Sequence, residues 1–357
     1  MAIYSDVDFA KDKDLKFEPQ IKKPGPASQD LHIDQLLEYD VPDDIHTLEG
    51  YKKYLEEMEI FEADKKWNKF RVKLKEVPKH KVGNEEGWII NPRKNYLAET
   101  IEKIKLPKGL GVDVDTRSSW ARFGLRVQHV DDELENLNGY KGTIPLAINS
   151  NDANIFLREG DRICQAVVYE LEKGCLSNGQ IYDELQNGQL ECYEMAPHDS
   201  KIKIPKFPIK NHSIQLTLNP VIKSFQEKFI DPKKDQSEKY VDINLGGGKE
   251  IPYMKFFLGS SNETLRIGDK YVGLLREIYT SPSRARVHSN AGYFDPGFEG
   301  TATLEQYIVP GGYNILYPGM KMGELEICSL KTPCKGLYHS KYSGQCGATP
   351  SKAHLDF

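Results

Sequence analysis

Short apolar segments separated by turn residues dominate the chain from residue 87 onward. Segments such as GWIINP, GTIPLAINS and DRICQAVVYEL alternate with Gly, Pro and Asn, and the same texture returns in GTATLEQYIV and KMGELEICSL. Many short strands with regular turn signals are typical of an all-β sandwich or barrel. We therefore predict a mainly β fold with few helices.

Residues 48–77 depart from this texture. Leu48, Tyr51, Leu55 and Met58 recur at helical spacing and would share one face of a helix. The residues that follow, WNKFRVKL, alternate more like a strand. We predict a helical insertion that covers the surface of the first domain; a helix that binds a partner is the alternative.

The chain also repeats itself. The segment GTIPLA at 142–147 resembles GTATLE at 300–305, and LREGDRI resembles LYPGMKM in the same order further along. Ordered matches favour a duplicated β domain over chance. The stretch between the copies lacks periodicity and is rich in Lys, Pro and Gly, which is typical of a linker. We predict a first domain at 1–175, a linker at 176–205 and a second domain at 206–357.

Composition and charge narrow the function classes. The chain has 357 residues, of which 39% are hydrophobic and 28% are charged, as in folded proteins. The net charge of −5 argues against a broad nucleic-acid surface, which needs basic residues. The sequence contains no apolar run of about 18 residues, and its first residues are too charged for a signal peptide. We expect a cytoplasmic protein that binds neither nucleic acid nor membrane.

Cysteine and histidine spacing argues against zinc. The six cysteines are scattered without a C-x-x-C pair, and the nine histidines show no H-x-E or H-E-x-x-H spacing. We expect reduced, structural cysteines and no protein-bound metal.

One difference between the copies points to chemistry. Where the first copy has Ala147, the second has Glu305 inside the apolar run TATLEQYIV. A buried carboxylate there would be costly unless it is paired or used. The alternative is a strand residue that faces solvent.

The segment DTRSSWARFGL at 115–125 is a candidate anion site. Arg117 and Arg122 flank two hydroxyl residues, and arginine suits bidentate contact with phosphate. The alternative is a helix N-terminus that Ser118 or Ser119 caps.

Two glycine-rich segments could contact a ligand. In AGYFDPGFEG at 291–300, an irregular loop would bring backbone groups against a base edge and Tyr293 or Phe298 against a sugar. The alternative is a tight turn in which Asp295 bonds its own backbone. The segment KYSGQCGATPSK at 341–352 is either a flexible tail or a flap over an anionic ligand.

These segments resemble the dCTP deaminase branch of the trimeric dUTPase superfamily, in its double-length bacterial form. The motifs that carry the resemblance keep the family's order: PASQDL (26–31), NYLAETIEKIKLP (95–107), RSSWARFGL (117–125), AGYFDPGFEGTATLE (291–305), YPGMKMGEL (317–325) and KYSGQCGATPSK (341–352). The resemblance implies two tandem dUTPase-like domains of β-clip or distorted jelly-roll architecture. It implies a hydrolase that converts dCTP to dUTP and ammonia in pyrimidine deoxynucleotide synthesis.

The resemblance also implies roles for individual residues. Glu305 would be the general base, Ser118 would position water, and Arg122 would steady the developing charge. The implied substrate-binding residues are Arg117, Ser119, Ala291, Gly292, Tyr293, Asp295, Tyr338, Lys341, Tyr342 and Gln345. Magnesium would bind through the triphosphate, zinc would be absent, dTTP would be an inhibitor, and a homotrimer is favoured over other oligomers.

The copies depart from the family because RSSWAR is present only in the first and the glutamate only in the second. We infer one composite site per chain, formed within a chain or across chains. A dUTPase, or a bifunctional enzyme that takes dCTP through to dUMP, is the nearest rival, since Asp295 stands where dUTPases activate water. A non-catalytic deoxynucleotide-binding protein is the alternative of another class.

Overall fold

The computed structural model describes residues 2–19, 25–39, 74–92, 94–130, 134–170, 174–196, 199–276, 287–310 and 313–357. The described part is mainly β, as predicted, with three short α-helices. The predicted helical insertion falls outside the described residues except for its last four, of which Leu74–Glu76 form a strand.

The first half contributes two α-helices and most of two sheets. Its elements are β1 (Ala2–Ile3), α1 (Asp6–Lys11), β2 (Lys16–Glu18), β3 (Gln29–Tyr39), β4 (Leu74–Glu76), β5 (His80–Val82), β6 (Glu85–Ile90), β7 (Asn95–Leu106), β8 (Leu110–Thr116), α3 (Ser118–Ala121), β9 (Leu125–His129), β10 (Tyr140–Ser150), β11 (Asn154–Leu157) and β12 (Arg162–Glu170).

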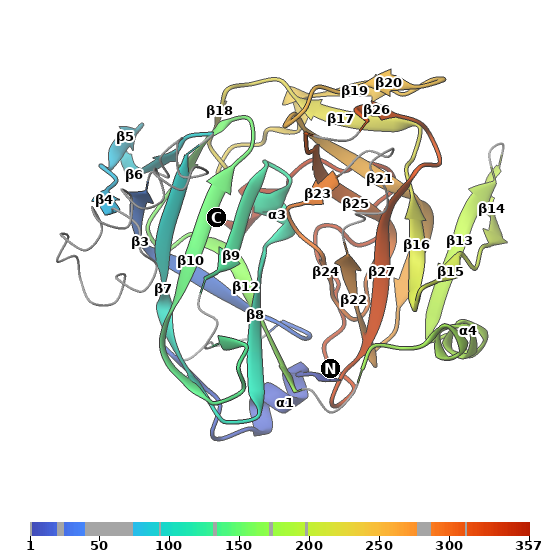
Figure 1. The fold of residues 1–357 in the computed structure, drawn as a ribbon, viewed down its shortest axis with the longest axis horizontal. Helices are drawn as coiled ribbons and strands as arrows, with labels where there is room; N and C mark the ends of the chain where they lie inside the picture. The colour runs from blue at the N-terminus through green and yellow to red at the C-terminus, as the bar shows by residue number, and fades with distance from the viewer. Residues whose placement is uncertain are drawn as a thin grey trace, which may run out of the picture.

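The second half contributes one α-helix and the remaining strands. Its elements are α4 (Asn178–Gln186), β13 (Leu190–Ala196), β14 (Asp199–Pro205), β15 (Ile209–Lys210), β16 (Ser213–Thr217), β17 (Val221–Phe225), β18 (Phe229–Ile230), β19 (Tyr240–Asn244), β20 (Lys249–Glu250), β21 (Phe256–Ile267), β22 (Tyr271–Arg276), β23 (Val287–Ser289), β24 (Tyr293–Phe294), β25 (Glu299–Ile308), β26 (Ile315–Leu316) and β27 (Lys321–Ser329). Figure 1 shows the halves side by side, blue to green and yellow to red.

The strand pairing repeats between the halves. The 12-residue strands β7 and β21 each pair antiparallel with a long partner, β10 in the first half and β25 in the second. Ala147 lies opposite Leu97, the third residue of β7, and Glu305 lies opposite Leu258, the third residue of β21. The two positions are therefore equivalent in the two copies.

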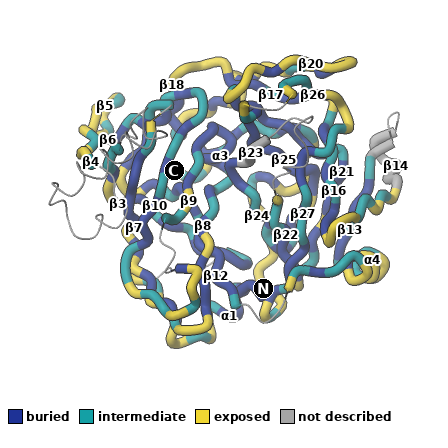
Figure 2. Tube along the Cα trace, in the orientation of Figure 1, coloured by how far each residue is buried: buried dark blue, intermediate teal, exposed yellow. Residues whose placement is uncertain are grey.

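The halves interlock. Strand β18 of the second half pairs in parallel with β11 of the first, and Phe225, Tyr240 and Phe256 join the core around Trp120 and Phe123. Buried residues concentrate where the halves meet, and exposed ones lie at the rim around β5, β20 and α4 (Figure 2). The first core is therefore completed by residues of the second half.

The stretch predicted as a linker is structured. Ser177 and Gln180 form a capping box at the start of α4, and β13 pairs with β21 in the sheet that also contains β25. The prediction of a linker at 176–205 is wrong because it relied on local periodicity. Pairing with a strand distant in sequence supplies the order that a local pattern does not reveal.

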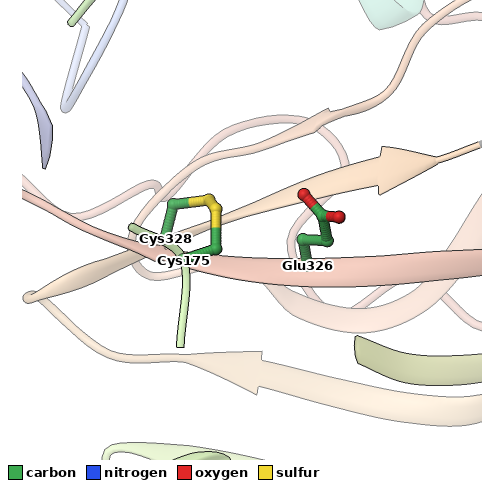
Figure 3. A group of neighbouring side chains, drawn as sticks. All are labelled: Cys175, Glu326 and Cys328. Carbon is green, nitrogen blue, oxygen red and sulfur yellow. A yellow bond between two sulfur atoms is a disulfide. The ribbon is translucent and has the colours of Figure 1, made fainter. Parts of the chain in front are cut away.

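The cysteines also differ from the prediction. Cys175 and Cys328 form a disulfide, although 153 residues separate them. An isolated antiparallel bridge brings their Cα atoms to 4.1 Å. Figure 3 shows the disulfide and, beside it, Glu326, which lies on β27 together with Cys328. The prediction that all six cysteines are reduced is therefore wrong, because sequence spacing does not reveal a contact made by tertiary pairing.

Among the described residues, no helix is long and apolar enough to cross a membrane.

Candidate active site

A small cavity lies where the two halves meet residues 338–352, here called the C-terminal segment. Its volume is about 50 Å³. It is lined by Ser118, Arg122, Ala291, Gly292, Tyr293, Phe294, Asp295, Phe298, Thr303, Glu305, Tyr338, Tyr342 and Gln345. All the predicted site residues except Arg117, Ser119 and Lys341 therefore line one cavity within one chain.

Glu305 and Arg122 form an ion pair across the two halves. Glu305 lies on β25, which is buried along nearly its whole length, and its Oε1 is 3.3 Å from Arg122 Nε. Each residue is only 3% exposed. Burial raises the pKa of Glu305 to about 7, although the Arg122 guanidinium opposes the rise. The alternative of a solvent-facing glutamate is therefore wrong.

Arg122 is held by three further contacts with the C-terminal segment. Its Nη1 donates to the Thr349 carbonyl at 2.9 Å, and its Nη2 donates to Gln345 Oε1 at 3.0 Å. Its guanidinium lies 3.6 Å from the centre of the Tyr342 ring. With its donors fixed, the guanidinium keeps one orientation toward Glu305.

The turn that carries Ser118 differs from the capped-helix alternative. α3 is a single turn, and its N-cap is Arg117, which makes no side-chain capping bond. Ser118 is the first helical residue and faces the cavity. Ser119 turns toward the C-terminal segment, where its Oγ accepts from the Tyr342 hydroxyl at 3.2 Å.

The loop at 291–298 is fixed from the first half. Asp115 Oδ2 accepts the Gly292 amide at 2.9 Å, and the Tyr293 hydroxyl donates to the Ala27 carbonyl at 3.1 Å. Burial is the main cause that raises the pKa of Asp115 to about 7. The loop backbone thus presents Ala291 to the cavity in one conformation.

Asp295 is the second acidic residue of the cavity. Burial raises its pKa to about 7, and the negative charge of Asp30 adds to the rise. Its Oδ1 is buried and accepts no hydrogen bond within the described part of the chain. A buried acceptor without a donor is suited to a ligand hydroxyl.

Two glycines let the C-terminal segment approach this loop. Gly297 and Gly300 have φ of +87° and +137°, and a Cβ would lie 2.7 Å from Tyr338 N at the first and 2.6 Å from Gln345 O at the second. Gln345 Nε2 donates to the Thr301 carbonyl at 2.7 Å. The C-terminal segment therefore lies closed over the cavity, which agrees with a flap and not with a flexible tail.

Arg117 and Lys341 lie outside the cavity in a group of their own. Both contact Asp356, at 3.3 Å from Arg117 Nη1 and 2.6 Å from Lys341 Nζ. Asp30 Oδ1 is 2.9 Å from Arg117 Nε. The two predicted triphosphate ligands are thus close together, with carboxylates beside them.

Sequence reasoning missed several functional contacts. Thr303 precedes Glu305 by two positions, so strand alternation alone would have placed it on the same face. Asp115 is the first residue of the candidate anion segment, but no role was assigned to it. Thr349 lies in the candidate flap segment but acts through its backbone, and nothing in the local pattern marks Asp356.

One group of three potential metal ligands occurs in the described ranges: Cys175, Glu326 and Cys328. None of the three lines the cavity, and both sulfur atoms belong to the disulfide.

Comparison with known proteins shows the family of the chain. A sequence model described as dCTP deaminase-like matches residues 10–171 and again 176–329. A "dCTP deaminase, dUMP-forming" of Corynebacterium jeikeium is 33% identical over 194 residues, covering 51% of this chain and 98% of the relative. One of Parafrankia sp. is 34% identical over 196 residues, covering 51% and 92%.

A solved structure shares the whole fold. The 2'-deoxycytidine 5'-triphosphate deaminase from Agrobacterium tumefaciens superposes with a TM-score of 0.68 at 17% identity. The match covers 94% of this chain and 99% of that one, so the tandem arrangement is common to both. With a family match in both halves, the chain belongs to the dCTP deaminase-like family as a tandem repeat.

Proposed function

We propose that this protein deaminates dCTP to dUTP and ammonia at the cavity between its halves. The observation that carries the proposal is the buried Glu305–Arg122 pair, in which one half supplies the base and the other the cation. A carboxyl with a pKa of about 7 exchanges protons readily at neutral pH, as general acid–base catalysis requires.

In the proposed reaction, Glu305 takes a proton from water while the water oxygen bonds to C4 of the cytosine. The protonated Glu305 then returns the proton to the amino nitrogen, the C4–N bond breaks, and ammonia leaves. Ser118 and the Ala291 backbone hold the water and the amino group. Arg122 stabilises negative charge at the carboxylate and the ring, because its donors are already oriented.

The remaining site residues bind the rest of the nucleotide. Asp295, with its unpartnered Oδ1, accepts a hydroxyl of the deoxyribose, and the Tyr293 ring packs against the sugar and leaves no room for a 2′-hydroxyl. Gly292 belongs to the same backbone turn. We assign the triphosphate to Arg117, Ser119, Tyr338, Lys341, Tyr342 and Gln345.

The binding of magnesium with the nucleotide and the absence of zinc both stay predictions. A magnesium ion that arrives with the nucleotide would be held by phosphate oxygens, and it would offset their charge beside Asp30. No step of the proposed reaction passes through zinc.

The substitution Glu305→Gln tests the proposal. We expect ammonia release from dCTP to fall by about 10²–10⁴-fold, the usual contribution of a general base. Binding of dCTP, measured by calorimetry, should change little, because glutamine keeps the shape and one acceptor for Arg122. Glu299→Gln on the same strand is the control, since Glu299 is exposed and lies outside the cavity. Normal turnover in Glu305→Gln would contradict the assignment, and wild-type protein that binds dCTP without product would identify a binding protein.

A second candidate is the further hydrolysis of dUTP to dUMP and pyrophosphate. It is favoured by the names of the relatives, which are described as dUMP-forming. Asp295 is the residue to activate the second water, and its buried carboxyl would do so when ionised. Separation of products decides: dUTP alone supports deamination only, whereas dUMP with pyrophosphate supports the bifunctional reaction.

A further inference from the structure

Three cationic side chains converge on one carboxylate near the C-terminus. Asp356 lies 2.6 Å from Lys341 Nζ, 3.3 Å from Arg117 Nη1 and 3.8 Å from Arg162 Nη2. Arg162 Nη2 also donates to the Asp356 backbone carbonyl at 3.2 Å. Lys341, Arg117 and Asp356 are largely buried, with side chains 12%, 16% and 17% exposed. An anionic group is thus held in a pocket of cations.

The three cations are not balanced by other carboxylates. Asp30 contacts Arg117 at 2.9 Å and Arg162 at 3.3 Å, but the ion pairs of Lys341 in the described part of the chain involve only Asp356. Without Asp356, three positive charges would face one negative charge. Such an excess attracts a multiply charged anion.

Asp356 and Asp30 differ in how firmly the chain holds them. Asp30 belongs to β3, which pairs with β12 and β7. Asp356 belongs to a single 3₁₀ turn, Ala353–Asp356. Leu355 within this turn is 61% exposed, and Phe357, which follows the turn, is 52% exposed. Ala353 at the start of this turn is buried. The turn can therefore leave the cations by a movement after Ala353 that breaks no strand pairing.

A second cavity provides room beside the carboxylate. It measures about 190 Å³, and its lining includes four cationic residues and three carboxylates: Arg117, Arg158, Arg162, Lys233, Glu159, Asp161 and Asp356. The main cavity, by contrast, measures about 50 Å³. A phosphate group that bound to Arg117 and Lys341 would need the position that the Asp356 carboxylate now occupies.

We propose that the Asp356 carboxylate occupies the binding position of the terminal phosphate and that a nucleotide must displace it to bind. The inference rests on the proposed function. Carboxylate and phosphate oxygens compete for the same N–H donors, and a terminal phosphate brings more charge and a third oxygen. A nucleotide with a shorter phosphate chain leaves Asp356 in place and gains none of these contacts. Asp356 is thus a specificity-determining residue for the triphosphate.

The substitution Asp356→Asn tests the competition. We expect KM for dCTP to fall roughly threefold to tenfold with kcat unchanged, the range for losing a partly exposed ion pair. KM for dCDP should stay within about twofold, so that the preference for dCTP rises. The matched control is Asp235→Asn, which removes a carboxylate 3.9 Å from His354 of the same turn and does not contact the three cations. A KM for dCTP that is unchanged or raised in Asp356→Asn, or lowered equally in the control, would overturn the proposal.

A measurement on the wild-type protein avoids any effect of the substitution on folding. Inorganic tripolyphosphate should speed backbone hydrogen exchange in residues 353–357 and leave β3 protected. Unchanged or slower exchange in that turn at saturating tripolyphosphate would show that Asp356 is not displaced. Since this probe requires no turnover, it reports on the turn even if the wild-type protein releases no ammonia from dCTP.

Discussion

At the scale of single residues, the site is a set of carboxyls whose pKa values are raised by burial. Glu305, Asp115 and Asp295 all have a pKa of about 7, and in each case burial is the largest cause. The negative charge of Asp115 adds to the rise at Glu305. Because the groups interact, an observed titration belongs to the cluster and not to one residue.

The first prediction at this scale concerns pH. If Glu305 must be ionised to accept a proton, kcat/KM for dCTP should rise with pH and reach half its maximum near pH 7. Asp115→Asn should move this midpoint downward, because it removes a neighbouring negative charge and keeps an acceptor for Gly292. The measurement is ammonia release across pH 5.5 to 8.5, with exposed Asp242→Asn as the control. A midpoint that does not move in Asp115→Asn would contradict the coupling.

The second prediction concerns stability. The pKa of Glu305 is higher in the folded than in the unfolded chain. Its favourable contribution to the free energy of unfolding is therefore complete below about pH 4.5 and is lost as pH rises toward 7. Glu305→Gln removes that loss. Relative to wild type, it should gain stability on the order of 2–3 kcal/mol between pH 5 and pH 8. Urea unfolding at both pH values measures this, and a pH-independent difference would count against a buried, titrating carboxyl.

At the scale of elements, the C-terminal segment acts as a lid on β25. Its contacts with Thr301, Arg122 and Ser119 close the site, and the remaining cavity of about 50 Å³ is smaller than the roughly 300 Å³ or more of a typical small-molecule pocket. We therefore predict that the lid lifts to admit a nucleotide and that closing it again brings Gln345 back to Arg122.

Gly300→Ala tests this element. The new Cβ would lie 2.6 Å from Gln345 O, so the lid could not close, and kcat/KM for dCTP should fall about 10- to 100-fold. The matched control is Gly319→Ala, since Gly319 also has positive φ (+77°) but no atom within 4 Å of its Cβ position. The control carries the backbone strain alone. Equal losses of activity in both variants would show that strain, and not the lid, is responsible.

At the scale of the whole molecule, the duplication produces one interlocked unit. Phe225, Tyr240 and Phe256 complete the first core, and Ile3 forms a bridge to Leu330 in the second half. The residues that line the candidate site also come from both halves of one chain. The trimeric state and the cytoplasmic location stay predictions.

Separated halves test this interlocking. Residues 1–175 expressed alone should lack a cooperative thermal transition and bind a hydrophobic dye, because the core around Trp120 is left uncovered. Co-expression with residues 206–357 should not restore full stability, since that fragment lacks β13, which pairs with β21. A sharp melting transition of the first fragment alone would contradict the prediction.

The extent of what could be predicted follows from the range of the interactions. The alternation of short strands with turns and the internal repeat are local patterns, and both can be read from the sequence. The roles of Glu305, Arg122 and Tyr293 came from a resemblance in motifs, and the structure brings those residues together. The pairing of β13 with β21, the Cys175–Cys328 disulfide and the contacts of Asp356 were not predicted, because each depends on a partner far away in the chain.

The sequence by itself determined the β class, the duplication and the residue types available for chemistry, since these follow from periodicity and composition within short windows. Only the tertiary structure decided which carboxylates are buried, which cysteines meet, and that Arg122 and Glu305, 183 residues apart, form one pair within one chain. Burial and pairing set the pKa values, and both depend on neighbours that only the folded chain assembles.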